Sequence, residues 1–468
     1  MTRKHDNKPK RASNRSAKVG KARGARRGVG GRNGAVRDDA RRDKGARPAG
    51  RAAGRSCALC PVFGRCGGCS QLDVPYDRQL AAKQQAVADL FAGLAPADAM
   101  RPILGMKEPF HYRNKVVSPY APAKGKPRRP SGGGKGRDTS AACADILTGM
   151  YAPGTHRLVP TDACAIENET AKRVTLAIRD IMARWGMEPY DEDAGTGFVR
   201  HAVVRVGHES GEVLVTVVTN GEEFPSAKAF CRELKRRVPE ITTIVQNVNT
   251  RQTNVILGEK ERVLYGPGFI LDRLCGLSFR ISSQSFYQVN ASQTEVLYDE
   301  AVRLAGLTGT ETVIDAYCGT GTIGLVAASR GAARVIGVDA VEAAIHDARG
   351  NARHNGIENA EFVAADATQF MEELAASGKR PRPLVLLMDP PRAGSTPAFL
   401  RAACELAPER IVYISRNPAT QARDVRQLGE SGYTVCAIRP VDMFPHTDHV
   451  ESIVMLERKM TDVLEKAL

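Results

Sequence analysis

Short apolar runs alternate with helix-like segments from residue 282 onward, and this alternation constrains the fold more than any other feature of the chain. A helix is predicted over 291–305, and a Gly-rich turn follows the next apolar run. The predicted strands cover 312–316, 334–338, 360–364, 384–388 and 410–414, and further helices are predicted over 323–329 and 341–355. Repeated β-α units of this kind form a parallel, doubly wound sheet with helices on both faces, which is an α/β fold.

The region before residue 282 has a different pattern, because its helical segments alternate less regularly with its apolar runs. Strands are predicted over 115–120, 146–151, 198–206, 212–219 and 242–247, and helices over 167–185 and 226–237. We therefore predict an α+β central domain over 56–281 and a doubly wound domain over 282–468.

The positive charge is concentrated in the N-terminal segment. Of the 67 Lys and Arg residues and the 52 Asp and Glu residues, 19 and 4 lie in residues 1–55, which leaves 48 of each sign in the rest of the chain. Residues 1–55 contain few large aliphatic side chains, so we predict a disordered basic tail. This tail and a basic, Gly-rich loop over 124–137 suit the phosphates of RNA, with a solubilising extension or an organellar transit peptide as alternatives for the tail.

The composition excludes several classes of protein. A hydrophobic content of 42% and a charged content of 25% are typical of soluble globular proteins. The longest apolar stretches, such as 383–388, are far shorter than the ~20 residues of a membrane span, and no apolar segment follows the basic N-terminus as in a secretory signal. We therefore expect a cytoplasmic monomer with no membrane association and no obligate protein partner.

Five cysteines form a pattern that indicates a metal centre. Cys57, Cys60, Cys66 and Cys69 fall within 13 residues, and Cys164 follows later in the chain. Glycines between them let several thiolates converge on one point, and the absence of a secretory signal disfavours disulfides. Zinc would use the two C-x2-C pairs, whereas an iron–sulfur cluster would use four thiolates with one distant ligand, so both remain open, as do unliganded thiols.

The Gly-rich turn after the strand at 312–316 predicts a nucleotide site. Gly319, Gly321 and Gly324 satisfy G-x-G-x-x-G, and Asp339 ends the next strand, where a carboxylate would bind ribose hydroxyls. This pattern fits NAD and S-adenosylmethionine equally well. Asp389 ends another apolar strand and is followed by two prolines, which form a rigid turn at the carboxyl edge of the sheet. Such turns occur in methyltransferases acting on planar nitrogenous bases, so we predict methyl transfer rather than NAD-dependent oxidoreduction.

Together these motifs resemble the RNA (uracil-5-)-methyltransferase family, whose members form 5-methyluridine in ribosomal and transfer RNA. The resemblance extends from about Cys60 to the C-terminus. It rests on the cysteine pattern and on the motifs Phe-His-Tyr-Arg-Asn-Lys at 110–115, Ser-Phe-Tyr-Gln-Val-Asn at 285–290, Asp-Ala-Tyr-Cys-Gly-Thr-Gly at 315–321, Asp-Pro-Pro-Arg at 389–392 and Asp-Met-Phe-Pro-His-Thr…Glu at 442–451.

The resemblance implies a Rossmann-like S-adenosylmethionine domain at the C-terminus, a central iron–sulfur domain, and an RNA substrate that we expect to be 23S rRNA. It places a four-iron, four-sulfur cluster on Cys60, Cys66, Cys69 and Cys164, with Cys57 as an extra thiol. The implied S-adenosylmethionine contacts are Gln288, Tyr317, Asp339 and Asp389, with Asp366 near the adenine.

The family's chemistry requires a thiolate and a base. The thiolate adds to C6 of a flipped-out uracil, C5 attacks the methyl group, and the base then removes the C5 proton. The resemblance implies that Glu451 is this base. In the family the thiolate lies in a Ser-Cys-Asn-Pro motif, but here Arg416 stands in the place of the cysteine.

Arg416 cannot act as the nucleophile, because a guanidinium stays protonated and has no lone pair available for addition. Cys318, beside the Gly-rich turn, and Cys404, on the helix before the strand at 410–414, are candidates for a substitute thiol. The sequence therefore allows two interpretations. One is a methyltransferase with an altered nucleophile position, and the other is an inactive pseudoenzyme that binds RNA and cofactor in rRNA or tRNA folding or assembly.

Overall fold

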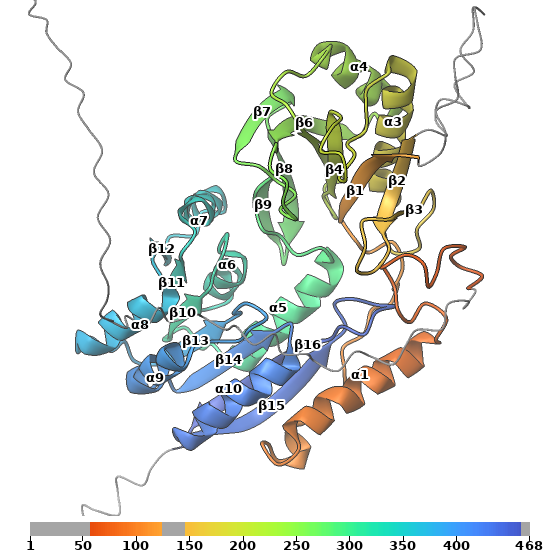
Figure 1. Ribbon diagram of the computed structural model, residues 1–468. Helices are drawn as coiled ribbons and strands as arrows, with labels where there is room; N and C mark the ends of the chain where they lie inside the picture. Colours follow the sequence, from red (N-terminus) through yellow and green to blue (C-terminus); the bar gives the residue numbers. More distant parts are fainter. Residues whose placement is uncertain (1–56, 124–145, 460–468) are drawn as a thin grey trace, which may run out of the picture. The chain divides into compact units, whose positions relative to one another are not determined.

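The computed structural model describes residues 57–123 and 146–459. These described residues form a single unit by their internal contacts. Within the described residues, the β structure consists of two seven-stranded sheets and a two-stranded ribbon (Figure 1). The predicted tail over 1–55 and the basic loop over 124–137 lie outside the described residues.

The first sheet belongs to the region predicted as α+β. Its strands, in sheet order, are β3 (Leu158–Pro160), β2 (Ile146–Tyr151), β1 (Lys115–Pro122), β4 (Val199–Val206), β5 (Val213–Thr219), β6 (Ile241–Val248) and β7 (Lys260–Tyr265). Neighbouring strands are antiparallel except for the parallel pair β5–β6. Helices α3 (Glu169–Trp185) and α4 (Ala227–Arg237) share a hydrophobic cluster with one face of this sheet.

The local sequence explains where α3 begins and ends. The side chain of Asn168 accepts hydrogen bonds from two backbone N–H groups of the first turn, at 3.0 and 3.1 Å. Val174, Ile178 and Ile181 are buried at helical spacing, and Gly186 ends the helix in the left-handed conformation. The cap, the apolar stripe and the terminal glycine therefore all predict the same helix, α3.

The second sheet contains the β-α units. Its strands, in sheet order, are β12 (Ala360–Ala364), β11 (Arg334–Asp339), β10 (Thr312–Ala316), β13 (Leu384–Met388), β14 (Arg410–Ser415), β16 (Glu451–Arg458) and β15 (Tyr433–Val441). The first five are parallel, as predicted, but β16 is antiparallel to both of its neighbours. The hairpin β15–β16 therefore completes a mixed sheet, which the β-α pattern alone did not predict.

Helices cover both faces of the second sheet (Figure 1). Helices α5 (Ala291–Ala305), α6 (Thr322–Ser329) and α7 (Glu342–His354) share one hydrophobic cluster with the sheet, and α1 (Tyr76–Phe91), α8 (Ala367–Ala376), α9 (Pro397–Leu406) and α10 (Pro418–Glu430) share the other. Neighbouring residues of β10 alternate between the clusters, since Val313 belongs to the first and Ile314 to the second. This alternation is the doubly wound arrangement that the sequence predicted.

The ribbon of β8 (Phe269–Leu274) and β9 (Leu277–Ser282) links the two regions. Ile270 of the ribbon and Leu214 of the first sheet belong to the same hydrophobic cluster as α5 of the second region. The predicted domain boundary between residues 281 and 282 therefore stays a prediction. A short 3-10 helix, η1 (Ala97–Ala99), follows α1, and no helix in the described ranges is both long and apolar enough to cross a membrane.

Candidate active site

The Gly-rich turn after β10 has a backbone that requires glycine. Gly319 and Gly321 have φ values of 55° and 78°, in the region that strains other residues. A Cβ atom at Gly321 would also lie 2.7 Å from the ring of Phe362, so the turn could not approach β12 as closely with a larger residue. Tyr317 has a φ of 67°, which is rare for an aromatic residue and marks this turn as a strained, functional backbone.

Four of the five residues predicted to contact the cofactor line one cavity of about 1180 Å³. Tyr317, Asp339, Asp366 and Asp389 reach this cavity from the carboxyl ends of β10, β11, β12 and β13. The volume exceeds that of most small-molecule pockets, so the cavity has room for a cofactor and a second ligand. This edge of the sheet is where doubly wound folds bind their ligands.

Two of these carboxylates also accept hydrogen bonds from nearby backbone N–H groups. Asp339 accepts hydrogen bonds from the backbone N–H groups of Gly319 and Val341, each at 2.9 Å. Asp366 caps α8 by accepting from the N–H groups of the first turn at 2.9 and 3.0 Å. These bonds fix the carboxylates at the rim of the cavity, where each has further lone pairs for a ligand.

Gln288 is not among the residues that line the cavity. Its backbone carbonyl accepts a hydrogen bond from Asn114 at 3.2 Å, and its side-chain Nε2 atom is buried without a partner. The predicted cofactor contact of Gln288 therefore stays a prediction. Phe286 and His346 also line the cavity, and neither was predicted from the sequence as a site residue. Phe286 lies in the motif at 285–290 and is an exposed aromatic residue, which is the signal that could have found it.

The Asp-Pro-Pro-Arg turn and the start of α10 are bonded together. Asn417 Nδ2 and Thr420 Oγ1 donate to the backbone carbonyl of Arg392, at 3.0 and 3.1 Å. Asn417 also caps α10, because its side chain accepts from the N–H of Ala419. These bonds hold Arg416, the residue just before Asn417, beside the turn that carries Asp389.

Arg416 and Glu451 leave neighbouring strands at the same end of the sheet. Ser415 and Ser452 are paired in the antiparallel ladder of β14 and β16, so Arg416 and Glu451 are next to this pair on either strand. Arg416 lines the cavity, and its guanidinium carbon lies 5.3 Å from the ring centre of Phe286. The Nε atom of Arg416 and both carboxyl oxygens of Glu451 are buried and have no hydrogen-bond partner in the described part of the chain.

Burial perturbs both carboxyl groups of this site. Together with the nearby Asp389 it raises the pKa of Glu451 to about 8, against the opposing charges of Arg416 and Arg392. Burial also raises the pKa of Asp389 to about 6, again against the charge of Arg416. A base whose pKa lies near neutrality is suited to proton transfer, and such perturbed groups mark functional sites.

Replacing Glu451 with glutamine should stabilise the protein at alkaline pH. The raised pKa means that the folded chain holds a proton that the unfolded chain releases, so stability falls as the pH rises from about 4.5 to about 8. Glu451→Gln removes this loss, with a gain on the order of a few kcal/mol at pH 8.5 and little gain at pH 4.5. Denaturant unfolding at the two pH values measures it, and the exposed Glu358→Gln is the control. Equal pH dependence in both variants would contradict the buried carboxyl.

Neither substitute thiol reaches the cavity. Cys318 and Cys404 are absent from its lining, as are all other cysteines of the described residues. Cys318 is buried, and burial raises the pKa of its thiol far above the ordinary value. The lining therefore gives no support to either cysteine as a substitute nucleophile, because the attack requires a thiolate in contact with the base.

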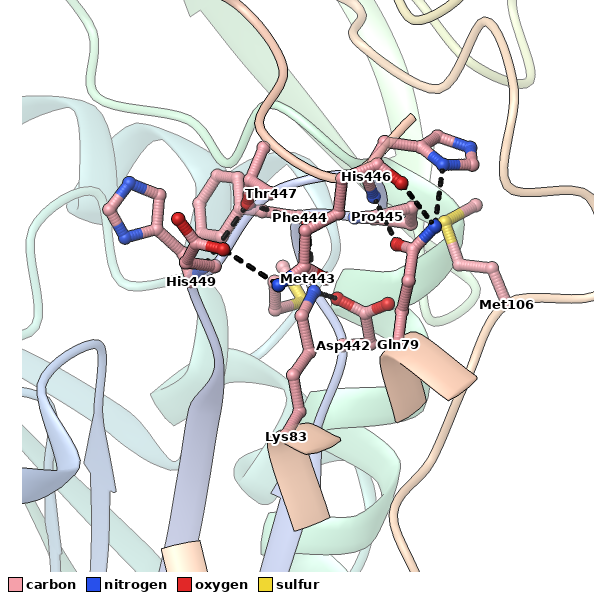
Figure 2. A network of polar contacts seen from close by, with 12 residues as sticks. Gln79, Lys83, Met106, Asp442, Met443, Phe444, Pro445, His446, Thr447 and His449 are labelled. Carbon is pink, nitrogen blue, oxygen red and sulfur yellow. Dashed lines mark hydrogen bonds and ion pairs between the residues drawn. The ribbon is translucent and has the colours of Figure 1, made fainter. Parts of the chain in front are cut away.

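The hairpin loop 442–450, between β15 and β16, is fixed by α1 (Figure 2). The ammonium of Lys83 lies 2.6 Å from the carboxylate of Asp442, and both side chains are buried. Lys83 also donates to the carbonyl of Phe444 at 3.1 Å. Gln79 accepts from the N–H of His446 at 2.9 Å, and its Nε2 lies 3.2 Å from His446 Nδ1. Helix α1 therefore holds the loop that leads into Glu451.

The segment after Cys69 contacts the same loop. The N–H groups of Ser70 and Gln71 both donate to the carbonyl of His446, at 2.9 and 3.0 Å. The loop then runs directly to Glu451, which is paired with the last residue of β15. The cysteine segment and the predicted base are thus connected through one short loop.

Four cysteines converge on a single apolar cavity. Cys60, Cys66, Cys69 and Cys164 all line it. Burial, together with the neighbouring Cys164 and Cys66, raises the pKa of Cys69 to about 12. The convergence brings together the four residues implied by the resemblance.

Cys57 lies outside this cavity. Its thiol donates to the carbonyl of Leu72 at 3.6 Å instead. The cavity therefore brings Cys164, and not Cys57, together with the other three cysteines, while the choice between zinc and an iron–sulfur cluster stays a prediction. The described residues contain no group of three or more His, Cys, Asp or Glu side chains placed to hold a metal ion.

Comparison with known proteins decides the family. A sequence model described as tRNA (uracil-5-)-methyltransferase matches residues 269–459. An uncharacterized RNA methyltransferase of Halalkalibacterium halodurans is 42% identical over 86% of this chain and 83% of its own length. The chain belongs to the RNA (uracil-5-)-methyltransferase family. A second RNA methyltransferase of this kind, from Bacillus cereus, is 40% identical over 86% of this chain and 84% of its own length.

A solved structure extends the likeness across both regions. The tRNA (uracil-54, C5)-methyltransferase of Pyrococcus abyssi, in complex with S-adenosyl-L-homocysteine, is similar with a TM-score of 0.66 and 27% identity. The match covers 86% of this chain and 87% of that chain. The described fold is therefore that of a member of the RNA (uracil-5-)-methyltransferase family with a Rossmann-like methyltransferase domain.

Proposed function

We propose that this protein transfers the methyl group of S-adenosylmethionine to C5 of a uridine in RNA. The observation that carries the proposal is the buried, unpartnered carboxyl of Glu451 next to Arg416, which itself lines a cavity with room for two ligands. A buried carboxyl without a hydrogen bond destabilises the folded state, so a role in proton transfer gives a reason for it.

The cavity divides naturally between the two ligands. Tyr317, Asp339 and Asp366 would hold S-adenosylmethionine, whose electrophilic methyl group is the chemistry that the cofactor supplies. Arg416 is shared with an adjoining depression lined by Arg392 and His449, which is where the RNA strand would approach. A flipped-out base entering from that side would meet Asp389 and Arg416 on the cavity wall.

The arginine at position 416 supports a second function for the same site. Arg416 cannot add to C6 of uracil, no cysteine of the described residues lines the cavity, and C5 is a poor nucleophile unless C6 carries an adduct. The protein would then bind RNA and cofactor without turnover and act in RNA folding or assembly. The family membership and the preserved base position favour methylation over this alternative.

One assay separates the two functions. The purified protein is incubated with labelled S-adenosylmethionine and with unmodified transcripts of transfer RNA and 23S rRNA, and the RNA is then digested to nucleosides. Labelled 5-methyluridine would support methylation. No labelled nucleoside, with both ligands still bound, would support the second function. The names of the family and of the solved relative both refer to transfer RNA, whereas the sequence led us to expect 23S rRNA, so both transcripts are needed.

We also propose that Cys60, Cys66, Cys69 and Cys164 hold a four-iron, four-sulfur cluster. Their convergence on one cavity supports this proposal, and four thiolates are the ligand set of such clusters. Iron analysis and absorbance near 400 nm in the purified protein would test it, and a colourless sample loaded with zinc would contradict it. We place the protein in the cytoplasm as a monomer, as the sequence led us to expect.

A further inference from the structure

The first sheet carries two neighbouring positive charges that have no acidic partner among the described residues. Lys115 of β1 and Arg205 of β4 are directly paired across the antiparallel ladder, so their side chains leave the same face of the sheet. Their neighbours Val116 and Val204 belong to the cluster under α3 and α4. Because side chains alternate along a strand, Lys115 and Arg205 project from the opposite face.

That opposite face is turned toward the wall of the cofactor cavity. Leu214, the β5 partner of Arg205, belongs to the hydrophobic cluster of the second region. The guanidinium of Arg205 donates through Nη2 to the backbone carbonyl of Ser285, and Ser285 and Phe286 line the cavity. The pair of cations therefore lies directly behind the segment that borders the proposed base site.

The surroundings of this pair contain positive charge without compensation. Arg205 is only 5% exposed, and its Nε atom has no hydrogen-bond partner. The side chain of Lys115 is half-buried, and it forms no hydrogen bond or ion pair with the side chains of the described residues. Burial and, to a lesser extent, the charge of Arg205 together lower the pKa of Lys115 to about 8. Two adjacent cations held away from water are costly unless an anion joins them.

We propose that Lys115 and Arg205 form a binding site for a backbone phosphate of the substrate RNA. The inference rests on the proposed function, because it assigns the phosphate to the strand whose uridine enters the neighbouring cavity. Lys115, which is reachable from solvent, contacts the phosphate, and Arg205 supplies a fixed charge from behind. Such a contact carries no sequence information and sets the register of the RNA relative to the base site.

The test compares Lys115→Met with Lys228→Met, which removes an exposed lysine of α4 on the other face of the same sheet. RNA binding is measured by fluorescence anisotropy with a uridine-containing single-stranded RNA at several salt concentrations. We expect Lys115→Met to weaken binding about tenfold at low salt and to reduce the slope of log affinity against log salt by about 0.7, the share of one phosphate contact. Lys228→Met should change neither quantity.

A pH series distinguishes the site from a structural role. A phosphate that pairs with Lys115 favours its charged form, so the affinity of the unaltered protein should fall as the pH rises through about 8. Lys115→Arg keeps its charge over this range, so this variant should bind RNA with a flatter pH dependence. Because Lys115→Arg retains the positive charge, its pH dependence still tests the phosphate site if Lys115→Met fails to fold.

Three outcomes would overturn the inference. Lys115→Met and Lys228→Met could bind RNA with the same affinity and salt slope, which would leave the proposed function intact. Lys115→Met could weaken S-adenosylmethionine binding alone, which would assign the anion to the carboxylate of the cofactor. The unaltered protein could fail to bind RNA under any condition, in which case the proposed function fails as well.

Discussion

Replacing Arg416 with cysteine should raise the rate of 5-methyluridine formation on the order of 10³-fold or more, because loss of a covalent nucleophile costs other enzymes at least this much. Arg416 lines the cofactor cavity on the strand next to the one that carries Glu451. A thiolate at this position would add to C6 of the uracil ring, and the C5 carbanion character that follows makes methyl transfer feasible. The carboxylate of Glu451 would then accept the C5 proton before the thiolate leaves.

The matched control is Arg416→Ser, which has the size of the cysteine variant but lacks a thiolate. Both variants remove the guanidinium, so any gain from relieving its bulk or charge appears in both. Only Arg416→Cys should form 5-methyluridine rapidly, as measured by mass spectrometry of digested RNA. Equal rates in the two variants, or an unaltered protein as fast as Arg416→Cys, would show that covalent addition at this position is not the missing step.

The pH profile of Arg416→Cys provides a second check of the site. Arg416 opposes the rise in the pKa of Glu451, so its loss should move that pKa above about 8. Proton removal requires the carboxylate form, so the rate should increase as the pH rises through and beyond this value. A rate independent of pH between 7 and 9 would assign the proton transfer to another group.

The residues at the edge of the second sheet that borders the cofactor cavity could be predicted, because the sequence patterns that identify them are local. Positive φ values and close contacts require glycine in the turn at 319–324. Asp339 is the last residue of one parallel strand, and Asp389 directly follows another. Parallel strands bring such ends to one edge whatever the rest of the chain does. The convergence of Cys164 with the earlier cysteines needed the resemblance, because no local pattern specifies a distant ligand.

The support of the base could not be predicted, because it depends on contacts between distant parts of the chain. Lys83 and Asp442 are 359 residues apart, and neither stands out in the sequence as a partner of the other. Helix α1 was also absent from the predicted elements, although it packs against α10 and holds the hairpin loop 442–450. The uncompensated pair of Lys115 and Arg205 likewise became visible only when the strand register was known.

The buried ion pair between α1 and the hairpin loop should be among the most sensitive positions of the fold. Lys83→Met would leave the carboxylate of Asp442 in a site that is fully buried, with Tyr76 as its remaining donor at 2.9 Å. Breaking one side of such a pair destabilises proteins by about 3–5 kcal/mol. Denaturant unfolding measures this change, and Arg78→Met, an exposed cation on the same helix, should change the stability little.

A second variant separates the loss of the pair from the loss of packing. Lys83→Met combined with Asp442→Asn removes both charges but keeps an acceptor for Tyr76, so part of the lost stability should return. In an Arg416→Cys background, Lys83→Met should also slow methyl transfer while S-adenosylmethionine binding is kept, because the loop it anchors leads into Glu451 and away from the cofactor residues. Hydrogen exchange should then be faster in residues 442–450 and unchanged in the turn at 319–324. If exchange rose equally in both segments, the ion pair would stabilise the fold as a whole and would have no particular part in placing the base.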